Sequence, residues 1–169
     1  KKSTTSQNSA IVLKSENLKI WFPVKRGVLR RLTGYVKAVD GVSVQIREGH
    51  TLGVVGESGS GKTTLALGLL RLEKSQGPIL FLGEHLQGKK WKALRPLRKE
   101  MQIVFQDPYG SLSPRMSVGQ IIEEGLLIHQ STLGDGKRRK LITDTLAEVG
   151  LDSTALDRYP HEFSGGQRQ

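Results

Sequence analysis

The sequence contains no cysteine among its 169 residues. Disulfides, thiolate zinc sites, iron–sulfur ligation from within the chain and a cysteine nucleophile are therefore excluded, and the absence fits a reducing compartment. Aromatic residues make up only 5%, which leaves little material for platforms on which nucleic-acid bases could stack. No apolar run approaches the roughly 18 residues of a membrane span. The longest runs, such as Ile79–Leu82, have the length of buried strands.

A secretory signal is also missing, because Lys1–Ala10 is polar and has no hydrophobic segment. These residues are rich in Ser, Thr and Lys and are interpreted as a linker or tail. The chain does not begin with Met, which hints that it was excised from something longer. Hydrophobic residues at 36%, together with 20 glycines, place the composition in the globular range and exclude disorder of the whole chain.

The charge is strongly unbalanced, with 26 Lys and Arg against 16 Asp and Glu and a net charge of +10. The cations lie in separate clusters at 25–31, 89–99 and 137–140. With so few aromatic residues, this pattern favours a solvated surface, or attraction to anionic nucleotides or lipid head groups, over a dedicated nucleic-acid face.

The hydrophobic pattern predicts strands in the first two thirds and helices in the last third, and no repeat of fixed period is visible. Strands are expected at 11–13, 18–20, 36–39, 42–46, 51–55, 77–83 and 101–105, and helices at 64–72, 92–99, 118–129 and 137–149. A basic loop is expected at 23–34, a hairpin turn at Asp40-Gly41 and a further turn at 47–50. This order of elements indicates an α/β protein with a helical appendage.

One motif carries clear chemistry: Gly56–Thr63 has the pattern G-x-x-x-x-G-K-T between a predicted strand and a predicted helix. Glycines allow consecutive backbone N–H groups to curl around a polyphosphate, and the helix directs its positive end to the same anion. Lys62 can reach the β- and γ-phosphate oxygens, and the Thr63 hydroxyl can ligate Mg²⁺. The alternative, a flexible surface turn, rarely produces this pattern in this context, so the motif predicts a nucleoside triphosphate site.

Two further segments are weak signals by themselves. Gln106 follows the apolar run Met101–Phe105 and precedes Asp107-Pro108, and a lone Gln there would mean little. Phe163–Gln167 is equally well explained as a Gly-Gly turn with a helix cap. No N-K-x-D motif for reading a guanine base is present, which argues against a GTPase.

Taken together, the three segments resemble the Walker A loop, the Q-loop and the signature motif of ABC-type ATPases, in that order. Phe163 stands where the signature usually has Leu. The wider text over 104–115 and 159–163 is similar to the oligopeptide/dipeptide import subgroup, which includes the tandem ATPases of microcin C and related peptide importers. The resemblance runs from about Ile11 onward.

The resemblance implies a P-loop NTPase (RecA-like) core with an N-terminal antiparallel β-subdomain and a helical signature subdomain, truncated at its C-terminal end. The expected division is a tail at 1–10 and an ABC ATPase domain at 11–169, of which 11–106 form the β-subdomain and core and 107–169 the helical subdomain.

The resemblance also implies roles for single residues. Phe22 falls where the family stacks adenine, although core packing at a strand end explains it nearly as well. Gln106 corresponds to the Q-loop residue that contacts Mg²⁺ and the attacking water, and Lys62 and Gln106 are the expected catalytic residues. Phosphate and Mg²⁺ binding falls to Gly56, Glu57, Ser58, Gly59, Ser60, Gly61, Lys62, Thr63 and Thr64, with the Glu57 side chain pointing outward. Binding of the γ-phosphate held by the opposite protomer falls to Ser164, Gly165, Gly166 and Gln167.

The function implied is the ATP-binding domain of an importer that uses ATP and Mg²⁺ to drive uptake of peptides or similar solutes. The implied partners are a second ATPase domain, transmembrane permease subunits and, indirectly, a substrate-binding protein, with no nucleic acid. The implied location is the cytoplasmic face of the plasma membrane. The alternatives are a non-transport ABC ATPase acting on nucleic acid or ribosomes, and a regulatory nucleotide-binding module.

Two elements of the family are not found in this sequence. An apolar strand ending in Asp-Glu and a switch His follow the signature in the family, and both are expected beyond Gln169. The 169 residues alone are therefore expected to be catalytically inactive and poorly stable. The Lys/Ser/Thr-rich start weakly suggests the second ATPase unit of a tandem chain.

Overall fold

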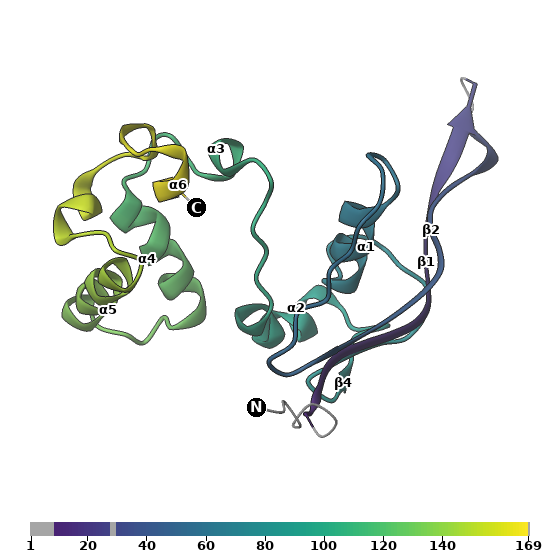
Figure 1. The fold of residues 1–169 in the computed structure, drawn as a ribbon, viewed down its shortest axis with the longest axis horizontal. Helices are drawn as coiled ribbons and strands as arrows, with labels where there is room; N and C mark the ends of the chain where they lie inside the picture. Colours follow the sequence, from purple (N-terminus) through teal and green to yellow (C-terminus); the bar gives the residue numbers. More distant parts are fainter. Residues whose placement is uncertain (1–8, 28–29, 169) are drawn as a thin grey trace, which may run out of the picture. The chain divides into compact units, whose positions relative to one another are not determined.

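The computed structural model describes residues 9–27 and 30–168. The chain forms two compact units, Lys1–Leu97 and Arg98–Gln169, which are drawn from purple to yellow along the chain in Figure 1. None of the helices in the described ranges is both long and apolar enough to span a membrane.

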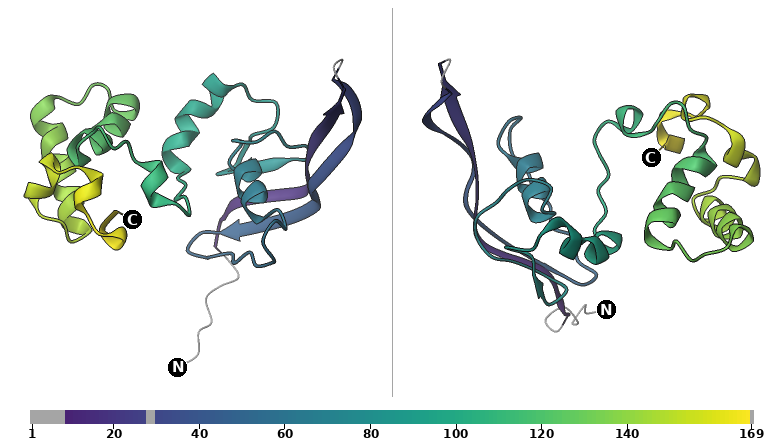
Figure 2. Two further views of the ribbon diagram at one scale, coloured as in Figure 1. Left: turned by 90° about the horizontal axis from the view of Figure 1, so that it is seen from above. Right: turned by 180° about the vertical axis from the view of Figure 1, so that it is seen from behind.

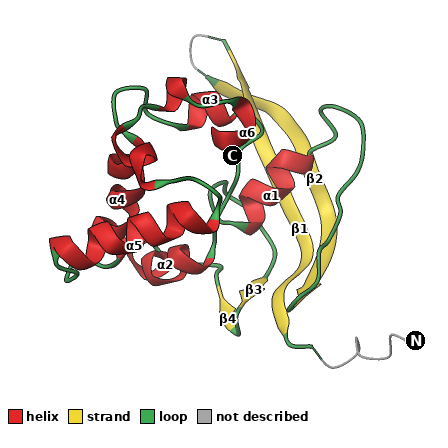
Figure 3. Ribbon diagram, turned by 60° about the vertical axis from the view of Figure 1, so that its left-hand side comes forward, coloured by secondary structure: helices red, strands yellow, loops and turns green. Residues whose placement is uncertain are grey.

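The first unit is organised around a long antiparallel hairpin, shown in yellow in Figure 3. Strand β1 (Ile11–Arg26) pairs with β2 (Arg31–Arg47) from Ile11 opposite Arg47 to Arg26 opposite Arg31. The basic loop expected at 23–34 was therefore wrong over most of its length, because both strands continue through it. Val28 and Leu29, which the expected loop also includes, lie outside the described residues.

The hairpin turn expected at Asp40-Gly41 was also wrong, because β2 runs straight through these residues. The pairing shifts there: Leu18 lies opposite Val42 and Lys19 lies opposite Asp40, so Gly41 is an extra residue in β2. Its φ of 78° is in the left-handed region that glycine adopts easily. A β-bulge requires the same backbone freedom as a tight turn, and this explains the misleading signal.

Two short strands complete the four-stranded sheet in the order β2-β1-β3-β4. Strand β3 (Ile79–Phe81) confirms the centre of the strand expected at 77–83, and β4 (Glu84–His85) pairs back onto it. Helix α1 (Lys62–Leu69) begins two residues before the predicted start and ends three before the predicted end. Leu18, Ile20, Ile79 and Leu86 are fully buried in this unit, and Leu18 and Ile20 lie beside Gly68 of α1.

The strands expected at 51–55 and 101–105 are wrong as assigned, since neither segment forms a strand in the structure. Val55 is 94% exposed and Val104 is 80% exposed. A β-strand is defined by hydrogen bonds to a neighbouring strand, and within 9–27 and 30–168 no strand pairs with either segment. Helix α2 (Trp91–Leu94) and a 3₁₀ segment, η1 (Arg95–Glu100), replace the single helix expected at 92–99.

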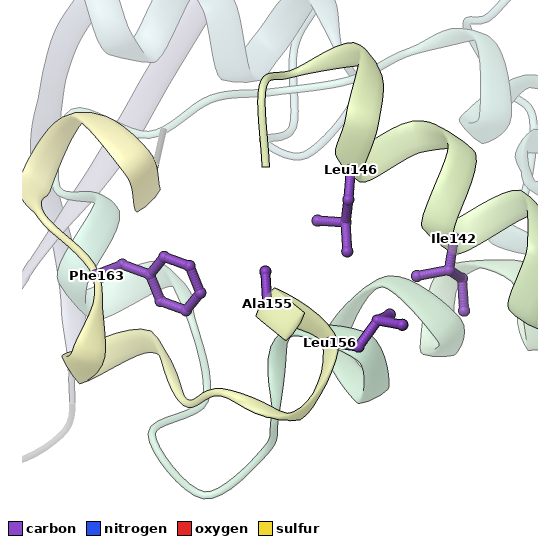
Figure 4. Packing of buried hydrophobic residues seen from close by; sticks show 5 residues of the cluster. All are labelled: Ile142, Leu146, Ala155, Leu156 and Phe163. Atoms are coloured by element: carbon purple, nitrogen blue, oxygen red, sulfur yellow. The ribbon is translucent and has the colours of Figure 1, made fainter. Parts of the chain in front are cut away.

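The second unit is helical, as expected. Helix α4 (Val118–His129) has the predicted bounds and α5 (Asp135–Glu148) begins two residues early, while shorter elements surround them: α3 (Pro108–Ser111), η2 (Ser153–Asp157), η3 (Pro160–Glu162) and α6 (Gly165–Arg168). Ser117 caps α4 through a reciprocal bond with Gln120. The core of this unit is a cluster formed by Ile142, Leu146, Ala155, Leu156 and Phe163, shown in Figure 4.

Candidate functional site

The loop of residues 56–61, which we call the phosphate loop, lies at the N-terminus of α1, and its residues 56–60 are exposed. Gly59 has a φ of 80° and Gly61, the N-cap of α1, a φ of 91°. Because Gly61 has no side chain, no side-chain hydrogen bond caps the helix. The first N–H groups of an α-helix have no partner within the helix, and together they attract an anion.

Gly61 is also fixed by a contact from the sheet. A Cβ atom added to Gly61 would fall well inside the van der Waals distance of the carbonyl oxygen of Ala38 in β2. Backbone therefore packs directly against backbone where the loop enters the helix. Ala38 could not be identified from the sequence, because nothing in the spacing of the motif reveals a contact from another element.

Lys62 curls over the loop that precedes it. Its Nζ donates to the carbonyl oxygens of Gly56 at 2.9 Å and Glu57 at 2.6 Å, and lies 3.5 Å from the Ser60 hydroxyl. These partners hold the ammonium group against the loop, and its positive charge suits an anion bound by the loop N–H groups. The carbonyl of Glu57 also accepts from the Ser60 N–H at 3.2 Å, whereas the Glu57 residue as a whole is exposed.

The atoms available in and beside the loop are of the kinds that bind a Mg²⁺–triphosphate group. It offers glycine N–H groups and one ammonium for phosphate, and the exposed Thr63 lies in the first turn of α1 with a hydroxyl for the metal. Thr64, the next residue, is half-buried. Among the described residues no group of three or more His, Cys, Asp or Glu side chains could hold a metal ion.

Phe22 lies on β1 opposite Val36 and is 38% exposed. Its neighbour Trp21 is occupied otherwise: the indole Nε1 donates to Asp40 at 3.1 Å, and the Lys37 ammonium lies 4.4 Å from the ring centroid. Part of the Phe22 ring is therefore available for stacking, while Trp21 is held by the hairpin.

The remaining candidates belong to the second unit. Gln106 is exposed and lies just before α3, in a segment without helix or strand. Ser164 is the residue before α6, and its hydroxyl accepts from the Gln167 N–H at 3.4 Å while the Gln167 side chain accepts from the Ser164 N–H at 3.1 Å. The structure thus brings the phosphate loop and Phe22 into one unit, and Gln106 and the signature segment into the other.

Phe163, the departure from the signature pattern, is a core residue. It is only 5% exposed within the cluster of Figure 4, and the Arg158 guanidinium lies 4.2 Å from its ring centroid. The adjacent Gly165 and Gly166 are exposed, and a Cβ added to Gly166 would meet nothing within 4 Å. A buried aromatic ring therefore anchors an exposed, glycine-containing helix start.

Comparison with known proteins identifies the family of the chain. The family described as "ABC transporter" matches residues 39–169, and the chain belongs to this family. A peptidoglycan transport ATP-binding protein, YejF, of Agrobacterium fabrum is 54% identical over 159 residues, which cover 94% of this chain and 29% of the relative. An oligopeptide transport ATP-binding protein, AppF, of Bacillus subtilis is 44% identical over 168 residues, covering 98% of this chain and 50% of the relative.

A solved structure shows the same fold. The ATP-binding cassette MJ0796, in a dimeric post-hydrolysis state bound to ADP and Pi, has a TM-score of 0.75 at 24% identity, covering 92% of this chain and 65% of that one. The fold class expected from the resemblance, an α/β P-loop ATPase cassette, is confirmed. The chain spans half or less of the length of the two relatives described above.

Proposed function

We propose that this cassette is the ATP-binding part of an importer and couples ATP binding and hydrolysis to uptake of peptides or similar small solutes. The observation that carries the proposal is the phosphate loop: an uncapped helix start at Gly61, a lysine folded over the loop and a hydroxyl at Thr63. The names of both relatives, which concern peptidoglycan and oligopeptide transport, support the class of substrate.

The residues of this chain would divide the work as follows. Glycine N–H groups and Lys62 would hold the β- and γ-phosphates, and the Thr63 hydroxyl would be a ligand to Mg²⁺. Phe22 would stack on adenine and Gln106 would orient the attacking water. ATP, when bound, would supply a phosphoanhydride bond whose hydrolysis is favourable in free energy. No strand ending in Asp-Glu occurs in the 169 residues, so we assign activation of water to no residue of this sequence.

The partners and location are part of the same proposal. Ser164, Gly165, Gly166 and Gln167 would grip the γ-phosphate held by a second cassette, so that each site is completed by its neighbour. The dimeric state named for the MJ0796 cassette supports such a pairing. Transmembrane permease subunits, served by a substrate-binding protein, would hold the cassette at the cytoplasmic face of the membrane. We also propose a division into a β-subdomain and core at 11–106 and a helical subdomain at 107–169, whereas the two compact units divide after Leu97.

The decisive experiment compares Lys62→Ala with Lys74→Ala in the full-length protein. Lys74 is an exposed lysine outside the loop, so its removal changes the charge equally. We expect Lys62→Ala to lower ATP hydrolysis by roughly 100-fold or more and to abolish uptake of a labelled peptide by cells. Lys74→Ala should change neither by more than about twofold.

Two results would contradict the proposal. Hydrolysis that survives Lys62→Ala would remove the phosphate loop from catalysis. Loss of hydrolysis with continued peptide uptake would show that the cassette does not drive import. That result would leave the alternative of a non-transport ABC ATPase acting on nucleic acid or ribosomes, which no observation on the described residues favours.

A further inference from the structure

The end of the β1–β2 hairpin carries a concentration of positive charge that the nucleotide site does not use. Four exposed cations lie there, and we call them the basic hairpin tip: Lys25, Arg26, Arg30 and Arg31. Asp40 is the only acidic residue between Glu16 and Glu48. Its carboxylate already accepts from Trp21 at 3.1 Å and lies 3.5 Å from the Lys37 ammonium.

The geometry at the tip brings like charges together. Arg26 and Arg31 are direct cross-strand partners, and like charges in this position destabilise a strand pair. The ion pairs formed by residues 9–27 and 30–168 include none of the four tip cations. An arrangement that is unfavourable alone becomes favourable when an external anionic surface supplies the counter-charge.

Apolar and aromatic side chains accompany these cations on the hairpin. Leu32, next to Arg31, is 53% exposed, and Val36 is 57% exposed. Tyr35 is half exposed and packs on Trp21 with ring centroids 6.0 Å apart. Lys and Arg interleaved with Trp, Tyr and exposed aliphatic residues is the composition found where proteins meet the head-group region of a bilayer.

The hairpin also presents the tip outward within its unit. Both views of Figure 2 show the two strands extending past helix α1, so that the end formed by Arg26 and Arg31 stands clear of the sheet's core. The aromatic rings are engaged with Lys37, Asp40 and each other. They are therefore not laid out as free faces on which bases could stack, which favours a membrane over a nucleic acid.

We propose that the basic hairpin tip is a membrane-contact site for the anionic phosphodiester head groups of a lipid bilayer, with Leu32 entering the interface. The tip gives the cassette a lipid contact of its own, separate from its binding to any permease. The proposal rests on the membrane location suggested under the proposed function, but its test uses vesicles without transport proteins. Its failure would leave the ATPase proposal intact, and failure of that proposal would leave the lipid measurement unaffected.

The test measures co-sedimentation of the purified full-length protein with vesicles of phosphatidylcholine alone and of phosphatidylcholine with 30% phosphatidylglycerol. Cations near an anionic surface contribute about fivefold each to binding. Replacing all four tip cations by Ser should therefore weaken binding to the anionic vesicles by at least about 100-fold. Binding of the unaltered protein should fall steeply between about 0.05 and 0.3 M salt.

The matched control replaces four exposed cations elsewhere by Ser: Lys90, Lys92, Lys137 and Arg139. This variant has the same net charge as the tip variant and should bind the anionic vesicles within about threefold of the unaltered protein. A third variant with Arg26→Lys, Arg30→Lys and Arg31→Lys keeps the charge and should also bind. Leu32→Ser should weaken binding by a few-fold without altering its salt dependence.

Three outcomes would overturn the proposal. One is an equal loss of binding to anionic vesicles in the tip and control variants, which would show that only net charge matters. Another is equal binding to neutral and anionic vesicles. The third is a tip that binds a DNA duplex or RNA hairpin more tightly than anionic vesicles at the same salt, since that would make the ligand a nucleic acid. ATP binding, followed with a fluorescent analogue, should be unchanged in all variants and reports that the first unit is folded.

Discussion

The phosphate loop and the signature segment are held in place by different parts of the polypeptide. The phosphate loop depends on backbone: Gly61 lies against the Ala38 carbonyl, and Lys62 bonds to the carbonyls of Gly56 and Glu57. The signature segment depends on side chains, because Phe163 is buried in an apolar cluster and Ser164 caps α6.

This difference follows from what each segment must present. A loop that binds phosphate through N–H groups has to leave them free, so side chains cannot cap it and shape must come from glycine and backbone contacts. A short helix start has little stability of its own and takes its position from the core beneath it. The loop should therefore be sensitive to added atoms, and the signature segment to removed ones.

The largest effect is expected where an atom is added to the phosphate loop. Gly61→Ala combines a left-handed φ with a Cβ that meets the Ala38 carbonyl. From the strain and overpacking together we expect a loss of about 3–5 kcal/mol of stability. Because the added Cβ would displace the loop N–H groups, nucleotide affinity should also fall, by about 100-fold or about 2.7 kcal/mol. Titration of a fluorescent ATP analogue into the full-length protein would measure this.

Gly59→Ala is the matched control, because its φ is also positive but its Cβ would meet nothing within 4 Å. It should lose only about 1–2 kcal/mol from backbone strain. Equal losses in the two variants would show that the contact with Ala38 does not matter.

The next effect tests removal of atoms from the helical core. Leu146 is 2% exposed, and Leu146→Ala should lower the stability of the second unit by about 3 kcal/mol through lost burial and a cavity. Hydrogen exchange of the α5 amides in the full-length protein would measure this. The half-exposed Leu127 on α4 provides the control, since Leu127→Ala should change exchange by less than about 0.5 kcal/mol.

Nucleotide binding sharpens this prediction. The phosphate loop belongs to the first unit, so Leu146→Ala should leave the affinity of the loop for a fluorescent ATP analogue within about threefold. A large loss of nucleotide affinity in this variant would show that the phosphate loop depends on the helical core of the second unit.

What could be foreseen from the sequence follows the same division between local and distant contacts. Helices α4 and α5 were predictable because their apolar spacing is local, and Ser117 marks the start of α4. The segments 51–55 and 101–105 carry strand-like apolar runs, but a strand exists only with a partner, which the runs themselves do not specify. At Gly41 the sequence shows that a positive φ is needed, without showing whether a turn or a bulge will use it.

The candidate site divides in the same way. The spacing of Gly56–Thr63 was sufficient to predict the loop, because all members of the motif are neighbours in the chain. The contact of Ala38 with Gly61 and the burial of Phe163 under Arg158 join residues that only the fold brings together. No pattern of neighbouring residues encodes such contacts.

A smaller effect separates the cap of α6 from its glycine. Ser164→Ala removes the acceptor for the Gln167 N–H and should cost about 1 kcal/mol. Gly166→Ala adds a methyl group to open space in a helix and should stabilise it by about 0.5–1 kcal/mol. If the Gly166 backbone contacts a γ-phosphate held by a second cassette, the added methyl group would hinder that contact. Gly166→Ala should then lower ATP hydrolysis by the full-length protein even though it raises stability. Unchanged hydrolysis with raised stability would restrict this glycine to a structural role.

The smallest effect is the pH dependence of stability. It compares Asp152, a carboxylate that accepts a backbone hydrogen bond, with Asp144, a carboxylate in an exposed ion pair. The Thr154 hydroxyl, together with the Thr154 backbone N–H at 2.7 Å, holds the pKa of Asp152 below its usual value. A carboxyl group whose pKa is lowered by folding stabilises the folded state at pH values above the pKa of the unfolded chain, about 3.9. This stabilisation is lost as the pH falls through the folded-state pKa.

Asp152→Asn keeps an oxygen that can cap η2 but cannot ionise. The unaltered protein should therefore be slightly more stable than this variant at pH 6 and should lose that advantage below about pH 4. Asp144→Asn, which breaks an exposed pair with Lys140 on α5, is the control in urea unfolding from pH 3 to 6. An advantage of Asp152 over Asn that grows on acidification would contradict the role of these hydrogen bonds.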